Sequence, residues 1–154
     1  MLIHLYGPLR KPPRLEIQSS QVLYVGANHH VNLVDRFYTS RPELIADNKQ
    51  VLAGRLPKEI ICTGQHTLRN ELILRYIGAE YRFIDMYSYF EDFIPTTGLL
   101  AAVDLTVNDN AKLVVVGMDH YGDAPKIKCH NMIKERAVWK KLIEEGKCTY
   151  WGQY

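Results

Sequence analysis

The feature that most constrains the fold is a short apolar run at residues 112–117 (KLVVVG), in which four aliphatic side chains follow one another. A strand with one solvated face alternates apolar and polar side chains, whereas a strand buried on both faces is apolar throughout. Strands of the second kind occur in parallel sheets that helices cover on both faces. The run is far shorter than the roughly 18–20 apolar residues that span a bilayer. It therefore predicts a central strand of a parallel sheet.

The rest of the chain alternates short β-rich runs with segments of helical period, as expected for parallel strands joined by helices. Further strands are predicted at residues 2–6, 21–26, 58–63, 80–84 and 148–151. Helices are predicted at residues 67–77, 97–107 and 131–145. Gly78 and Gly146 end the first and last of these helices. We expect a single Rossmann-like α/β domain over residues 1–154, with a mostly parallel sheet and helices on both faces; residues 27–57 have no clear pattern.

The three predicted helices differ in where their apolar residues lie. The helix at 97–107 is small and aliphatic almost throughout, which predicts that it packs against the sheet. The other two have an apolar stripe. These stripes consist of Leu68, Leu72, Ile73 and Ile77 in the first helix, and Ile133, Ala137, Leu142 and Ile143 in the last.

Charge and cysteine content exclude several classes of protein. The formal net charge is +2, from 19 basic and 17 acidic residues. The chain therefore lacks the excess of basic residues that is typical of nucleic-acid-binding proteins. The three cysteines are odd in number and sparse, which argues against a disulfide framework and favours a reducing compartment. The first residues contain neither a basic leader nor an apolar h-region, so we expect no signal peptide. We expect a cytoplasmic protein without a transmembrane segment.

The first chemical motif is Pro95-Thr96-Thr97-Gly98 at the start of the apolar helix. Doubly wound sheets bind ligands outside the carboxyl ends of their strands, where helices of this kind begin. Free N–H groups and the positive end of the helix dipole form an anion site, and a glycine lets a ligand approach the backbone. The alternative is a threonine N-cap that follows a proline turn.

The second motif, Gly117-Met118-Asp119-His120-Tyr121, directly follows the buried strand. The hydroxyl of Tyr121 can donate to a phosphate without adding a charge. The alternative is a polar loop with Tyr121 packed at its rim, and Asp119 holding a neighbouring loop through backbone N–H groups.

The third motif is His130-x4-Glu135, which leads into the last helix. Histidine is the usual general base near neutral pH. If both residues were helical, five steps of about 100° would place them about 140° apart, too far for a direct pair. If His130 precedes the first turn, it is free to face the pocket. The alternative is a histidine at the helix start and an exposed glutamate.

Other chemistries are not supported by the spacing of the residues. No metal site is predicted, because His29, His30, His66 and His120 have neither HxxxH nor CxxC spacing around them. The chain contains no GxGxxG after the first strand, no P-loop and no GxSxG elbow. Cys62 lies in a predicted buried strand and is interpreted as a core residue.

Together and in this order, the three motifs resemble those of the sialyltransferases. Residues 95–100 (PTTGLL) are similar to the small sialylmotif, and residues 117–121 (GMDHY) to the Gly-x-Asp-x-Tyr strand end of bacterial members. His130-x4-Glu135 is similar to the very small motif. The amino-terminal half agrees less closely, although Gly7 and Pro8 follow the first strand and Asn28 follows the second, as in the family.

The resemblance implies the sialyltransferase variant of the GT-A fold and a metal-independent, inverting glycosyltransferase. The enzyme would transfer sialic acid or a related acidic sugar from a CMP-linked donor to a glycan hydroxyl, with no further cofactor. His130 would be the general base. The other assigned residues would bind the donor: Thr96, Thr97 and Gly98 its carboxylate, Tyr121 its phosphate, and Gly7 and Asn28 its CMP part.

The chain departs from the sialyltransferases in one feature, and two other functions would fit the same fold. Only eight residues separate Tyr121 from His130, where relatives have a lid-like segment. A short lid exposes the donor to water, which favours hydrolysis or weak activity. The same fold would also serve as a non-catalytic nucleotide- or sugar-binding module or an assembly protein, or as a glycosyltransferase with another nucleotide sugar. An exposed sheet edge would suit a homo-oligomer.

Overall fold

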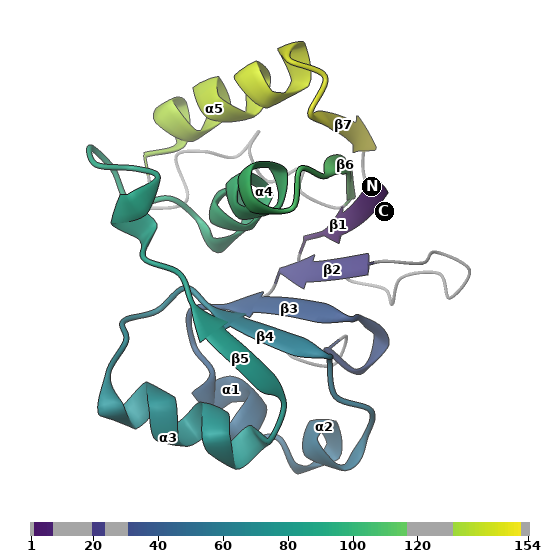
Figure 1. The fold of residues 1–154 in the computed structure, drawn as a ribbon, viewed down its shortest axis with the longest axis vertical. Coiled ribbons are helices and arrows are strands. Elements are labelled where there is room, and N and C mark those ends of the chain that lie inside the picture. Colours follow the sequence, from purple (N-terminus) through teal and green to yellow (C-terminus); the bar gives the residue numbers. More distant parts are fainter. Residues whose placement is uncertain (1, 8–19, 24–30, 117–130, 152–154) are drawn as a thin grey trace.

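The computed structural model describes residues 2–7, 20–23, 31–116 and 131–151. Its strands form one seven-stranded sheet in the order β5-β4-β3-β2-β1-β6-β7, and all six neighbouring pairs are parallel (Figure 1). The strands are β1 (Leu2–Tyr6), β2 (Ser20–Leu23), β3 (Arg36–Thr39), β4 (Glu59–Cys62), β5 (Glu80–Phe83), β6 (Lys112–Val116) and β7 (Cys148–Trp151). The predicted Rossmann-like α/β fold is confirmed.

Five α-helices connect these strands and lie on both faces of the sheet (Figure 1). They are α1 (Glu43–Ala46), α2 (Lys49–Ala53), α3 (Leu68–Ile77), α4 (Thr97–Asn108) and α5 (Met132–Glu144). Two short 3-10 helices, η1 (Val31–Leu33) and η2 (Met86–Ser88), lie in the connections. Helices α1, α2 and α3 cover one face, and α4 and α5 cover the other. Among the described residues, no helix is long and apolar enough to cross a membrane.

Successive side chains along each strand point to opposite faces of the sheet, so the interior consists of two cores. In β4, Ile61 contributes to the core beneath α4 and α5, whereas its neighbours Ile60 and Cys62 contribute to the core beneath α1 to α3. In β6, Leu113 and Val115 face the first core, and Val114 and Val116 the second. Both sides of β6 are therefore covered, which is why its apolar run has no polar break.

The chain reverses its direction of travel across the sheet at β1. From β1 it runs outward through β2, β3 and β4 to the edge strand β5. Helix α4 then crosses back to β6 on the other side of β1, and α5 leads on to the opposite edge strand β7. The point between β1 and β6 is therefore the topological switch point, where ligands of open α/β sheets bind.

The described part of residues 27–57, for which the sequence predicts no element, contains strand β3, the 3-10 helix η1 and the two short helices α1 and α2. Strand β3 has only four residues, and pairs with both β2 and β4. The predicted strand at 21–26 is described only as β2, because residues 24–26 lie outside the described residues. The other strands and the three longer helices are confirmed to within one or two residues.

The helix ends agree with the sequence, and α4 is buried against the sheet as predicted, but the predicted faces of α3 and α5 are not the buried ones throughout. Thr67 caps α3 and Gly78 ends it with a φ of 90°, a conformation that favours glycine. The predicted stripe of α3 is partly wrong: Ile77 is buried, but Leu68 and Leu72 are exposed.

The predicted stripe of α5 is also largely wrong. Ile133 is 79% exposed and Ala137 is exposed as well, so neither contributes to the core. Of the predicted stripe, Leu142 is buried in the core, where Trp139 joins it, and the first turn of α5 buries Glu135.

Candidate functional site at the carboxyl edge of the sheet

Gly7 lies directly at the switch point. It follows β1, is buried, and donates its N–H to the carbonyl of Val116, the last residue of β6, at 2.8 Å. This bond extends the β1–β6 pairing by one residue. The predicted donor-binding residue Gly7 is therefore placed where doubly wound sheets bind ligands.

Threonine side chains follow the next strands along this edge. Thr39 ends β3 and Thr63 follows β4, and both are buried. The hydroxyl oxygen of Thr63 lies 3.4 Å from the hydroxyl oxygen of Thr97 in the first turn of α4. The turn after β4 is tight, because a Cβ on Gly64 would lie 2.7 Å from the carbonyl oxygen of Ser40. The start of α4 is thereby tied to the carboxyl end of β4.

The first turn of α4 presents backbone donors at this edge. Thr96 is the N-cap, and its hydroxyl accepts from the N–H of Leu99 at 3.3 Å. The N-cap alternative for this threonine is thus confirmed. The N–H groups of Thr97 and Gly98 donate to no other described residue. They are the groups that an anion at a helix N-terminus binds.

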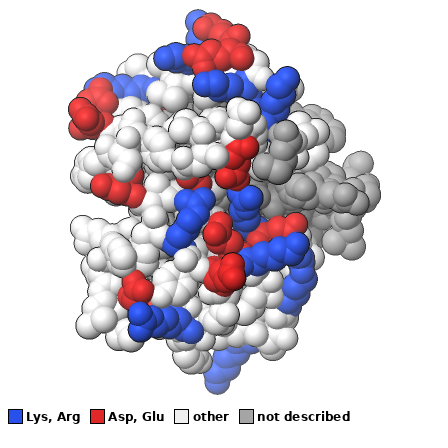
Figure 2. Space-filling model, viewed as in Figure 1, with Lys and Arg blue, Asp and Glu red and all other residues white. Residues whose placement is uncertain are grey.

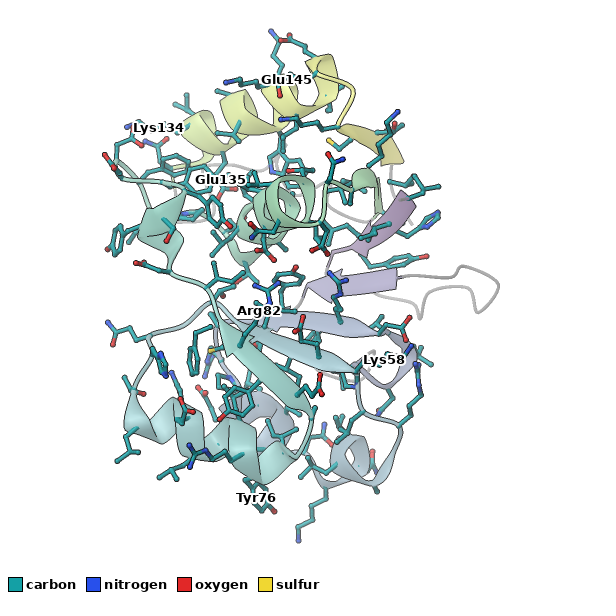
Figure 3. The ribbon with its side chains drawn as sticks, viewed as in Figure 1. Lys58, Tyr76, Arg82, Lys134, Glu135 and Glu145 are labelled. Atoms are coloured by element: carbon teal, nitrogen blue, oxygen red, sulfur yellow. The ribbon has the colours of Figure 1, made fainter. Side chains whose placement is uncertain are left out.

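Glu135 from α5 joins the third sequence motif to the first. Its side chain is fully buried, and one carboxylate oxygen accepts a close hydrogen bond from the backbone N–H of Thr96. The other oxygen accepts from the hydroxyl of Thr96 at 3.0 Å. The exposed-glutamate alternative is therefore wrong. Figure 3 shows Glu135 between α5 and α4.

The first turn of α5 also holds the segment that leads into α4. The Lys134 ammonium lies 2.7 Å from a carboxylate oxygen of Asp92 and 6.0 Å from the ring centroid of Phe93. Phe93 in turn packs edge-to-face on Phe90, which belongs to the core under α4. Helix α5 thus contacts residues 92–96 through two successive side chains, and the two helix starts are held together.

A buried ionic network supports the other end of α4. Asp104 is 1% exposed and accepts from the Tyr38 hydroxyl at 2.7 Å and from Arg82 at 2.7 Å. Burial alone would raise the pKa of Asp104, but the hydrogen bonds from Arg82, Tyr38 and Asn108 outweigh it and hold the pKa below its usual value. Figure 3 shows Arg82 between β5 and α4, and Figure 2 shows acidic and basic side chains meeting across the middle of this face.

The described residues therefore place four of the seven predicted site residues. Gly7, Thr96, Thr97 and Gly98 all lie at the carboxyl edge, although Thr96 already uses both of its donors on Glu135. The other three, Asn28, Tyr121 and His130, lie outside the described residues.

Two residues of this edge were given no role in the predicted site, although Glu135 belongs to the third motif. The burial of Glu135 could have been predicted, because the residues one and two turns further along the same side of the helix are apolar. Thr63 ends a predicted strand, but nothing local distinguishes it from the other polar residues at strand ends. Burial raises the pKa of the Cys62 thiol just before it, in line with its interpretation as a core residue.

The comparisons with known proteins give no family. The chain matches no protein-family model, no curated protein and no solved structure. Within the described ranges, no three histidine, cysteine, aspartate or glutamate side chains are grouped as a metal site needs. The function is therefore argued from the site alone.

Proposed function

We propose that the carboxyl edge of the sheet binds a CMP-linked acidic sugar and that the protein transfers this sugar to a glycan hydroxyl. The observation that carries the proposal is the contact between Glu135 and Thr96. It brings together two of the motifs that resemble the sialyltransferases, 39 residues apart in the sequence. The N–H groups of Thr97 and Gly98, which donate to no other described residue, and the switch point at Gly7 support a bound anion at this edge.

In the proposed reaction, His130 removes the proton of the acceptor hydroxyl as its oxygen attacks the anomeric carbon. The bond from that carbon to the CMP phosphate breaks, the configuration inverts, and CMP leaves with the bond's electron pair. The Tyr121 hydroxyl donates to the leaving phosphate, and Gly7 and Asn28 hold the CMP part. Thr97 and Gly98 bind the donor carboxylate through hydroxyl and backbone N–H groups. A cytoplasmic location belongs to the same proposal.

A second candidate is a binding module without transfer activity. One observation favours it: the hydroxyl and the N–H of Thr96 are both satisfied by Glu135, so the segment is complete as a helix cap without any ligand. The two candidates share the nucleotide site and differ in turnover.

The deciding experiment combines binding with turnover. Calorimetric titration should show binding of CMP and none of UMP, GDP or NAD. Incubation with a CMP-linked sialic acid and a mixed glycan acceptor should release CMP, and His130→Ala should lower that rate by about 10²–10⁴-fold with CMP affinity unchanged. His66→Ala is the matched control, because His66 pairs with Glu71 on α3 and is exposed. Binding of CMP without turnover would establish the binding module, and no binding of CMP would reject both candidates.

A further inference from the structure

Helix α3 carries an apolar stripe on the side that faces away from the sheet. Leu68, Leu72 and Tyr76 follow one another at intervals of four residues and are 75%, 54% and 71% exposed. The same helix buries Leu74 and Ile77 on its opposite side. Figure 3 shows Tyr76 projecting from α3 away from the sheet. We call the three exposed residues the outer stripe; exposed apolar residues that are grouped in this way mark interaction sites.

Basic side chains flank the outer stripe on both sides. At about 100° per residue, the stripe covers about 80° of the helix circumference, and Arg75 and Arg69 lie about 20° beyond its two sides. Both arginines are exposed. Arg69 has no hydrogen-bond or ion-pair partner among the described residues, and Arg75 contacts only the Tyr81 hydroxyl and, at 3.6 Å, Glu71. Both guanidinium groups therefore have donors to spare.

The one acidic residue of α3 is turned away from this surface. The Glu71 side chain is 21% exposed, and its carboxylate accepts from the Tyr81 hydroxyl at 2.7 Å. The Nε2 of the exposed His66 lies 2.6 Å from its other oxygen. These contacts hold the negative charge beside β5. A partner of α3 therefore meets an apolar stripe between two cations, and the complement of that surface is an apolar layer with negative charge at its boundary.

We propose that α3 lies on an anionic lipid bilayer, with the outer stripe at the boundary between headgroups and acyl chains and both arginines on lipid phosphates. Amphipathic helices bind bilayers in this way, with apolar side chains inward and basic side chains among anionic headgroups. Arginine keeps its apolar stem in the layer while its charged end reaches the phosphates. The ring of Tyr76 suits the same boundary, because one end is apolar and the other is polar.

The size and shape of this surface favour a bilayer over an acidic protein. Figure 1 shows α3 at the outside of the molecule, where a flat surface can reach it. A ten-residue helix is about 15 Å long, so a protein partner would bury an area at the low end of specific interfaces. The two arginines lie on opposite sides of the stripe and about 9 Å apart along the helix axis. A bilayer supplies phosphates at both places, because its lipids diffuse and no fixed register is needed. This proposal does not depend on the nucleotide site.

Vesicle cosedimentation of the full chain tests the proposal, with phosphatidylcholine alone and with about 30% phosphatidylglycerol added. Binding to the anionic vesicles should be at least about tenfold stronger, because each basic residue near such a surface contributes about fivefold. Arg69→Gln should therefore weaken binding about fivefold. Leu72→Ser should weaken it by about tenfold or more, because it removes an apolar side chain from the layer.

Two variants on α5 are the matched controls. Ile133→Ser removes an apolar side chain that is more exposed than Leu72, and Lys140→Gln removes a positive charge from an exposed position. Both should leave binding unchanged. The proposal would be overturned by the absence of binding to anionic vesicles or by equal binding to both kinds of vesicle. An equal loss with Arg69→Gln and Lys140→Gln would also overturn it, because net charge alone would then explain the binding.

A fluorophore sensitive to its surroundings tests whether the outer stripe enters the bilayer. It is attached to Tyr76→Cys in a Cys129→Ser background, in which the buried Cys62 and Cys148 remain. Its emission should increase and shift to shorter wavelengths with anionic vesicles, whereas the same label on Ile133→Cys should not respond. Binding without a response at position 76 would reject insertion of the stripe. Stronger binding to soluble polyglutamate than to the vesicles would instead indicate an acidic protein partner, and would likewise overturn the proposal.

Discussion

Asp104 shows how much of this fold depends on a few buried polar side chains. Its carboxylate lies between α4 and β3–β5, where Tyr38 and Arg82 reach it from two different strands. Asn108, one turn further along α4, donates to it at 2.6 Å. A buried carboxylate is tolerated only with several such donors. The three donors therefore also fix the position of α4 over the sheet.

Replacing Asp104 by asparagine should lower the free energy of unfolding by about 1–3 kcal/mol at pH 7, because Arg82 loses its closest counter-ion. The pKa of Asp104 is lowered in the folded state, so this stabilisation is present above the ordinary value of 3.8 and is lost as the pH falls through the folded value. The difference between wild type and Asp104→Asn should therefore shrink below about pH 4. Urea denaturation between pH 3 and pH 7 measures it, and a constant difference would contradict the assignment.

Glu135 is the second residue with such a role. Glu135→Ala should destabilise the protein by about 2 kcal/mol, because it leaves the N–H and the hydroxyl of Thr96 without their acceptor. Glu135→Gln keeps one carbonyl acceptor and should cost less. Thermal unfolding compares both with Glu144→Ala, an exposed position on the same helix. Equal effects of Glu135→Ala and Glu144→Ala would remove Glu135 from the contact with α4.

At the scale of the element, α3 shows that helix ends and helix faces are determined differently. Its ends are local: the Thr67 side chain accepts from the N–H of Asn70, and Gly78 takes a left-handed conformation. Its faces are not local, because apolar residues occur on both sides and the core covers only one of them, where Leu74 and Ile77 are buried and Ile73 is partly buried. The exposed side carries Leu68, Leu72 and Tyr76, and its apolar character follows from no requirement of the sheet.

Gly78→Ala should lower the free energy of unfolding by about 1 kcal/mol, because a side chain is strained at a φ of 90°. A Cβ there would meet no atom within 4 Å, so the loss is conformational and not a clash. Gly78→Asn should lose less, because asparagine tolerates this conformation best after glycine. Chemical denaturation of the two variants is the measurement, and a larger loss for asparagine than for alanine would refute this explanation.

At the scale of the whole molecule, the sheet is a single layer between two cores, and its strands differ in how well they are protected. Strands β1 and β3 are paired on both sides, and their buried side chains face both cores. Strands β5 and β7 are the edges and pair on one side only. Opening of an edge strand breaks one ladder, whereas opening of a central strand breaks two ladders and disrupts both cores.

Native-state hydrogen exchange should therefore show the slowest amides in β1, β3 and β6, with an opening free energy close to that of global unfolding. The amides of β5 should exchange faster by a free energy of about 1–3 kcal/mol. Equal protection of β5 and β1 would mean that the sheet opens only as a whole.

The sequence by itself determined the elements whose signals are local. The apolar run of β6, the caps of α3 and the polar segments that follow the strands depend on nearby residues, and the parallel α/β class follows from their alternation. Thr96 to Gly98 could be chosen on these grounds, whereas Gly7 was assigned through the resemblance to the sialyltransferases.

Only the tertiary structure decided the rest, because those features depend on partners far away in the chain. Strand β3 is too short to carry a pattern, and exists because β2 and β4 pair with it on both sides. The buried face of α5 carries Glu135 and not Ile133, because the start of α4 offers an N–H and a hydroxyl at that point. The periodicity of α5 contains no information about Thr96. The sequence of that helix alone therefore cannot predict the contact that joins the two motifs.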